Sequence, residues 1–227
     1  MLIPLIIPIA YCILYKKNRI VDSIIIFIIM VTIVIFYWPV TNLFSSTANL
    51  YAKFLIFIIL PIIFLFFYDK AYHFFVKSDD KIFDWKLFGI NTEGLEKSLK
   101  YGLLFIPLMS LTTFIIFWIL NIQTNSDLIT GSVYFVESLS EEFLFRGILF
   151  LFLFKRLNLK VAYVTSLFSF ILVHPQYFSS ILIIITIVQG ILTIEIVKRS
   201  NNLLGAWILH GFNRVFALVI FPFIMIF

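Results

Sequence analysis

Long apolar runs separated by short polar segments dominate the chain. A helix needs about 20 apolar residues to cross a bilayer, and eight runs approach that length. They cover residues 2–15, 23–40, 52–68, 101–121, 132–154, 160–174, 180–197 and 203–226. The pattern therefore predicts an all-α, polytopic membrane protein with about eight transmembrane helices.

The composition supports this class and excludes several others. Apolar residues make up 62% of the chain and charged residues 13%, against roughly a quarter charged in soluble domains. A single cysteine, Cys12, excludes a disulfide framework, a thiolate zinc cluster and a C-x-x-C redox pair. The net charge of +5 does not predict nucleic-acid binding, because the basic residues lie in short clusters between apolar runs.

Lysine and arginine are concentrated in alternate loops. Fourteen of the 17 follow the first, third, fifth and seventh apolar runs. Only Lys53 is assigned to the opposite loops, while Arg146 and Arg214 lie inside predicted spans. Because cytoplasmic loops are enriched in these residues, both termini are expected to be extracytoplasmic.

One extended polar stretch divides the chain. Residues 69–100 mix acidic and basic side chains with aromatic ones, which predicts an amphipathic connector on the cytoplasmic face. We expect residues 1–100 to hold transmembrane helices 1 to 3 and this connector. Residues 101–227 are expected to form a core of helices 4 to 8.

Ionisable side chains within a span are costly and indicate a functional site. They are confined to the last four predicted spans, and the interiors of spans 1 to 4 carry no charge. The charged residues and histidines assigned to these spans are Glu137, Glu141, Glu142, Arg146, His174, Glu195, His210 and Arg214, and Asn213 lies one turn after His210. The sequence thus predicts a site in a C-terminal four-helix core.

The fifth span carries two adjacent glutamates, which point about 100° apart on a helix. Arg146 follows Glu142 by one turn and can pair with it. This pairing leaves Glu141 free, as suits a general base beside a second carboxylate. The alternative is an ion pair that only fixes helix packing. Two histidines and Asn213 on other spans can converge around one water.

The remaining charged residues have simpler expected roles. Glu195 is expected to pair with Lys198 and Arg199 at the interface. Glu137, one turn before Glu141, either faces the same cavity or lies in the outer water layer. Arg214 either pairs with a site carboxylate or closes the cavity electrostatically.

These motifs together resemble the CPBP family of intramembrane proteases, which includes type II CAAX prenyl endopeptidases and bacterial Abi-type bacteriocin-processing or immunity proteins. Glu141, Glu142 and Arg146 match its Glu-Glu-x-x-x-Arg motif, and Phe170 and His174 match Phe-x-x-x-His. The third motif, usually His-x-x-x-Asn, is matched in part. His210 is followed by Asn213 at +3 and by Arg214 at +4.

The resemblance implies peptide-bond hydrolysis within the membrane of a prokaryotic cell. Glu141 would activate a water with help from His174, while His210 and Asn213 would stabilise the oxyanion. Arg146 would order Glu142. No cofactor is implied. A zinc site held by His174, His210 and Glu141 or Glu142 is the alternative, because such ligand sets occur in catalytic zinc sites.

Three functions are compatible with the sequence. The leading one is an intramembrane endopeptidase acting on a membrane-associated or lipidated protein or peptide. The second is a catalytically inactive Abi-like immunity factor or regulator that binds a peptide or membrane partner, and the departure in the third motif favours it. The third is a small proton-coupled carrier with a Glu-His relay, against which spans 1 to 4 show no matching polar set.

Overall fold

The structure, a computed structural model, describes residues 1–43, 46–76, 83–124 and 127–224. Within these ranges it is helical without strands. The elements in chain order are η1 (Ile3–Leu5), α1 (Ile6–Tyr15), η2 (Lys17–Arg19), α2 (Ile20–Leu43), α3 (Ser46–Val76), η3 (Trp85–Phe88), α4 (Leu95–Ile119), α5 (Leu128–Glu142), η4 (Phe143–Phe152), α6 (Leu153–Arg156), α7 (Leu159–Leu172), η5 (Pro175–Tyr177), α8 (Ile183–Ser200), α9 (Leu204–Val215), η6 (Phe216–Ile220) and α10 (Phe221–Ile224). The all-α class is confirmed.

Helices occur at the eight predicted places, but their bounds and lengths differ from the prediction. Judged by length and composition, four helices of the described residues are long and apolar enough to cross a membrane. They are Lys17–Tyr37, Ala48–Phe74, Leu95–Ile119 and Leu204–Ile224, and Ile3–Tyr15 and Leu159–Leu172 are shorter apolar helices. The count of eight spans therefore stays a prediction, as does the division at residue 100.

The polar connector is shorter than predicted at both ends. Helix α3 continues to Val76, and α4 begins at Leu95. Between them Phe88 is fully buried and packs against Phe143 and Phe152 of η4. The segment 77–82 lies outside the described residues. In the described part of the connector, the buried Phe88 side chain attaches it to the protein core.

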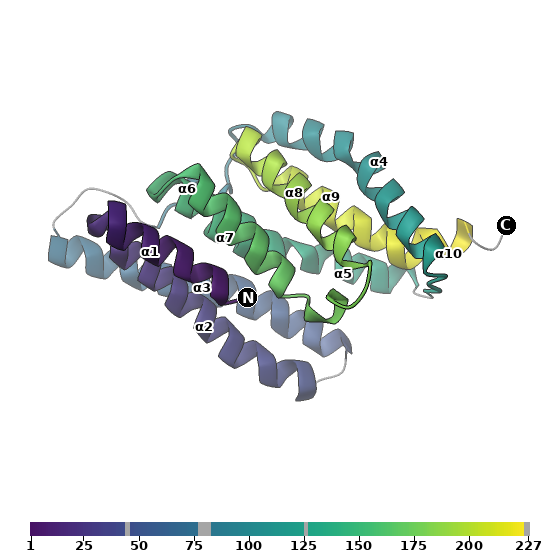
Figure 1. The fold of residues 1–227 in the computed structure, drawn as a ribbon, viewed down its shortest axis with the longest axis horizontal. Helices are drawn as coiled ribbons and strands as arrows, with labels where there is room; N and C mark the ends of the chain where they lie inside the picture. The colour runs from purple at the N-terminus through teal and green to yellow at the C-terminus, as the bar shows by residue number, and fades with distance from the viewer. Residues whose placement is uncertain (44–45, 77–82, 125–126, 225–227) are drawn as a thin grey trace.

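The helices form two groups (Figure 1). Helices α1, α2 and α3 lie along one side, and α4, α8 and α9 lie along the other, with α5 and α7 between them. Helix α3 packs on α5, and α1 packs on α7, while α9 contacts both α4 and α5. The N-terminal helices therefore cover the helix that carries the two adjacent glutamates.

The predicted fifth span is not a uniform α-helix. Its α-helical winding ends at Glu142 and is followed by the ten-residue π-helical segment η4. All ten residues of η4 are buried, as expected for a helix that is apolar nearly all round. A second π-helical segment, η6, begins directly after α9. Wide turns of this kind are frequent at functional sites.

The basic loop clusters meet at one end of the bundle. The Lys16 ammonium donates to the carbonyl of Leu157 at 2.7 Å, and that of Lys155 donates to the carbonyl of Lys86 at 2.8 Å. The Asn202 amide donates to the carbonyl of Asn91 at 2.6 Å. These contacts join the polar segments after the first, third, fifth and seventh predicted spans, so the alternation inferred from charge is consistent with the packing.

Candidate active site

The two adjacent glutamates end α5 deep in the protein. Glu141 and Glu142 are 1% and 0% exposed. Asp127 precedes the first residue of helix α5, and its carboxylate accepts from the backbone N–H of Thr130. This bond holds the pKa of Asp127 below its ordinary value and caps the helix that carries the glutamates.

Glu142 forms the predicted pair with Arg146. The Arg146 Nε lies 3.2 Å from Glu142 Oε2 and donates to the Thr193 hydroxyl at 2.8 Å. The guanidinium also stacks over the Phe170 ring at 4.0 Å. Arg146 is fully buried. These contacts hold Glu142 in place from helices α7 and α8.

Glu141 is not free, so the prediction that it lacks a partner is wrong. Its Oε1 pairs with Lys53 of α3 and with Arg214 of α9, whose Nη2 is 2.7 Å away. Glu137 binds the same cations, at 2.8 Å from Lys53 and 2.6 Å from Arg214. The Glu142–Arg146 pairing does not isolate Glu141, because helices from elsewhere in the sequence supply two further cations.

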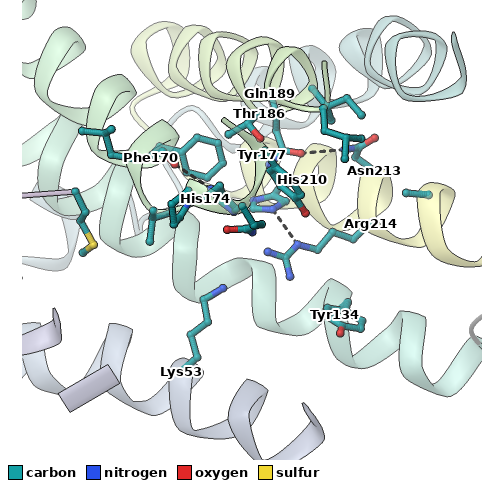
Figure 2. Close-up of a pocket in the computed structure, with 18 of the residues that line it drawn as sticks. Lys53, Tyr134, Phe170, His174, Tyr177, Thr186, Gln189, His210, Asn213 and Arg214 are labelled. Carbon is teal, nitrogen blue, oxygen red and sulfur yellow. Dashed lines mark hydrogen bonds between the residues drawn. The ribbon is translucent and has the colours of Figure 1, made fainter. Parts of the chain in front are cut away.

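Lys53 is the residue that sequence reasoning missed. It was assigned to a loop, but it lies in α3 and is 9% exposed. Figure 2 shows it reaching from α3 toward the two histidines. Helix α3 and helix α4 both contribute to the site, so the expectation of a site built from the last four spans alone is wrong. The signal was a single lysine close to the start of an apolar run.

His210 lies between the two glutamates and Arg214. Its Nδ1 is 2.7 Å from Glu142 Oε1, and its Nε2 is 3.7 Å from Glu141 Oε2. Arg214 Nε donates to His210 Nε2 at 3.1 Å. Since a guanidinium can only donate, Nε2 is the acceptor and Nδ1–H donates to Glu142. Both ring nitrogens of His210 are therefore engaged, and neither offers an N–H to the cavity.

His174 follows α7, and its Nδ1 lies 3.0 Å from the carbonyl of Phe170. Its ring stacks on Tyr177, at 5.7 Å between centroids. The Phe170 ring contacts both imidazoles, with centroid distances of 5.2 Å to His174 and 6.0 Å to His210. The two histidines thus flank one aromatic ring at the same site.

Asn213 turns away from His210. It accepts from the Thr113 hydroxyl at 2.7 Å and donates to Gln189 Oε1 at 3.0 Å. Helix α9 keeps α-helical winding through Val215, so no local rewinding moves Asn213 to the +4 position. Arg214 occupies that position and forms the contacts to His210 and the glutamates. The predicted oxyanion role of His210 and Asn213 stays a prediction.

A cavity of about 1160 Å³ opens onto this cluster. His174, His210, Asn213, Lys53 and Arg214 line it, together with apolar side chains. The two glutamates at the end of α5 are not among the described residues that line it. The two cations therefore lie between the cavity and the carboxylate of the first glutamate.

The other predicted pairings are found as well. Glu195 Oε1 is 3.0 Å from Lys198 Nζ, and Glu195 Oε2 is 3.4 Å from Arg199 Nε. Both pairs lie at the end of α8, outside the cluster. The predicted contact of Arg214 with a site carboxylate is confirmed, and so is the location of Glu137 at the same cluster.

The arrangement is poorly suited to a zinc ion. Both ring nitrogens of His210 are engaged by Glu142 and Arg214, and Glu141 Oε1 pairs with two cations. A zinc ligand has to present a free lone pair to the metal. Among the described residues, no group of three or more His, Cys, Asp or Glu side chains has a metal-binding arrangement.

Comparison with known proteins identifies the part of the chain that carries the motifs. Residues 108–216 match the family model of the type II CAAX prenyl endopeptidase Rce1-like proteins. No curated protein matches the chain, and no solved structure matches it. The apolar helices and the match to a membrane protease family indicate an integral membrane protein. Residues 108–216 are therefore similar to the Rce1-like type II CAAX prenyl endopeptidase family, which confirms the resemblance to the CPBP family.

Proposed function

We propose that this protein is an intramembrane endopeptidase that hydrolyses a peptide bond in a membrane-associated or lipidated protein. The observation that carries the proposal is the state of the Glu141 carboxylate. Its Oε1 is held by two cations. Its Oε2 is buried 3.7 Å from His210 Nε2 and has no hydrogen-bond partner among the described residues. A buried carboxylate oxygen without a partner is costly, and a bound water would satisfy it.

The chemistry proceeds by general base and then general acid catalysis. Glu141 Oε2 takes a proton from a water whose oxygen attacks the scissile carbonyl carbon, and the carbonyl π electrons move to its oxygen. The tetrahedral intermediate then collapses, the C–N bond breaks, and the proton on Glu141 passes to the leaving nitrogen. His174, at the cavity wall, orients the water. Arg146, Glu142 and His210 position Glu141 through the contacts described above.

Water reaches Glu141 only when the cations move. Because Lys53 and Arg214 line the cavity and Glu141 does not, the state described here is closed. We define these two cations as the clasp. An opening of the clasp on substrate binding exposes Oε2 to the cavity and admits the peptide bond.

The closed clasp also favours the second candidate, a family member that binds a peptide without cleaving it. In that case the clasp stays shut and the cavity only holds the partner. We further propose that the protein has eight transmembrane helices and that its basic loops face the cytoplasm. We also propose that catalysis requires no metal.

The test is cleavage of a farnesylated, quenched-fluorescent CAAX peptide by the purified protein in liposomes. We expect wild-type cleavage that is insensitive to EDTA. Glu141→Gln keeps the size of the side chain and removes the base, so kcat should fall by about 10²- to 10⁴-fold. Glu195→Gln, in the ion pair at the end of α8, is the matched control and should stay within about twofold of wild type.

Three outcomes count against the proposal. Wild-type turnover in the Glu141→Gln variant would overturn the assignment of the base. Peptide binding without cleavage favours the silent binder. Loss of activity in EDTA that zinc restores would establish the metal alternative.

A further inference from the structure

Helix α8 carries a stripe of polar side chains for which the sequence predicted no role. Thr186, Gln189 and Thr193 are 5%, 6% and 0% exposed in an otherwise apolar part of the helix. Burial of such groups requires hydrogen bonds. Thr193 has its partner in Arg146, whereas Thr186 and Gln189 line the cavity.

The Gln189 amide is oriented by a relay from two other helices. The Thr113 hydroxyl of α4 donates to Asn213 Oδ1, and Asn213 Nδ2 of α9 donates to Gln189 Oε1. Figure 2 shows the Asn213 bond at the cavity. Because Oε1 is the acceptor, the N–H groups of Gln189 are directed elsewhere. Among the described residues, Gln189 Nε2 has no hydrogen-bond partner.

The bonded nitrogens of His210, Asn213 and His174 are directed to other partners. The Nδ1–H of His210 donates to Glu142, and its Nε2 accepts from Arg214. Asn213 Nδ2 donates to Gln189 Oε1, and His174 Nδ1 faces the carbonyl of Phe170. A developing oxyanion needs fixed donors aimed at it. Gln189 supplies two N–H groups, on a side chain that its neighbours hold in place.

We propose that Gln189 is the donor that polarises the scissile carbonyl and stabilises the oxyanion. Asn213 and Thr113 are positioning residues that act through it. The inference rests on the proposed function. It also accounts for the departure in the third motif, since an asparagine at +3 faces α8 and orients a glutamine there instead of contacting the carbonyl itself.

The test uses the liposome cleavage assay with Gln189→Glu and Gln189→Met. Gln189→Glu retains an acceptor for Asn213 but removes the donor, and Gln189→Met removes both groups at similar length. Both should lower kcat by about 10²- to 10³-fold with KM within about threefold, as for loss of an oxyanion donor. Glu195→Gln, on the same helix but outside the cavity and the charged cluster, is the matched control and should keep kcat within about twofold.

Thr113→Val tests the relay. It should lower kcat by less than the Gln189 variants and leave KM unchanged, because Gln189 remains but is less well oriented. Thermal melting in detergent identifies any variant that fails to fold. Wild-type kcat in the Gln189→Glu protein, or equal losses in kcat for Glu195→Gln, would overturn the role of Gln189 alone. Absence of cleavage by the wild type overturns the proposed function and this inference together.

Discussion

At the scale of single residues, the site is a cluster of balanced charge. Three carboxylates face three cations, and both histidines lie beside them. The members are Glu137, Glu141, Glu142, Lys53, Arg146 and Arg214. Breaking one buried pair leaves an uncompensated charge in a low-dielectric region, which costs several kcal/mol. Each charge therefore stabilises the arrangement of the others.

Replacing Arg214 distinguishes two roles of this residue: stabilising the charged cluster, and blocking access from the cavity to Glu141. Arg214→Asn returns the His-x-x-x-Asn spacing and removes one of the two cations of the clasp. Lys53 still pairs with both Glu137 and Glu141, so we expect the variant to fold, with a lower melting temperature because one carboxylate loses its compensation. Because a closed state that must open reduces the competent fraction, kcat in the liposome assay should rise by about tenfold. Arg214→Lys, which keeps the charge, should change kcat less. A lower kcat for Arg214→Asn than for Arg214→Lys contradicts the clasp.

At the scale of elements, two close contacts decide the geometry of the site. Helix α3 brings Lys53 to the end of α5, and α9 approaches α4 closely enough for Asn213 to reach Thr113. The second approach depends on small residues. A Cβ at Gly205 would lie 1.9 Å from the carbonyl oxygen of Ser98, and the backbone N–H of Gly205 donates to the Ser98 hydroxyl at 2.8 Å. The helices cannot meet in this way around a larger side chain.

Gly205→Ala should therefore force α4 and α9 apart. We expect a loss of about 3 kcal/mol in unfolding free energy, at the upper end of ordinary overpacking, and a lower kcat as Asn213 loses Thr113. Gly131→Ala is the matched control. The Cβ it adds would lie 2.6 Å from Val219 Cγ2, a side-chain atom and not backbone, so we expect a smaller loss than for Gly205→Ala. Thermal melting in detergent measures both. Equal melting temperatures for the two variants would show that the α4–α9 approach is less tight than described.

At the scale of the whole molecule, the apolar surface and the charged interior reverse the usual distribution of a soluble protein. Large apolar side chains are exposed on the outer faces of several helices, among them Ile35, Phe67, Leu104 and Trp118. Lipid is the solvent that suits such a surface. Cationic loops gather at one end, and the cavity lies between the two helix groups. The enrichment of cytoplasmic loops in lysine and arginine predicts that this end faces the cytoplasm.

Cysteine labelling tests this topology. Cys12 is the single cysteine of the sequence. A Cys12→Ala parent therefore carries no thiol and should show no background labelling. With a membrane-impermeant maleimide on intact cells, Gln123→Cys should be labelled, because it lies beyond the fourth predicted span. Lys17→Cys and Arg199→Cys should react only after permeabilisation. Labelling of Gln123→Cys and Lys17→Cys from the same side would contradict the alternation, and with it the number of spans between them.

The sequence by itself determined the helical class, the alternation of basic loops and the pairing of Glu142 with Arg146. These depend on composition and on neighbours one turn apart, which periodicity reports directly. Only the tertiary structure decided that Lys53 joins Glu141 and that Asn213 binds Gln189. It also decided that π-helical winding begins within the first motif, after Glu142, and again directly after α9. The partners of a buried polar group depend on which distant helices meet and at what separation. A single sequence carries no local signal for that, because many helix pairings satisfy the same apolar pattern.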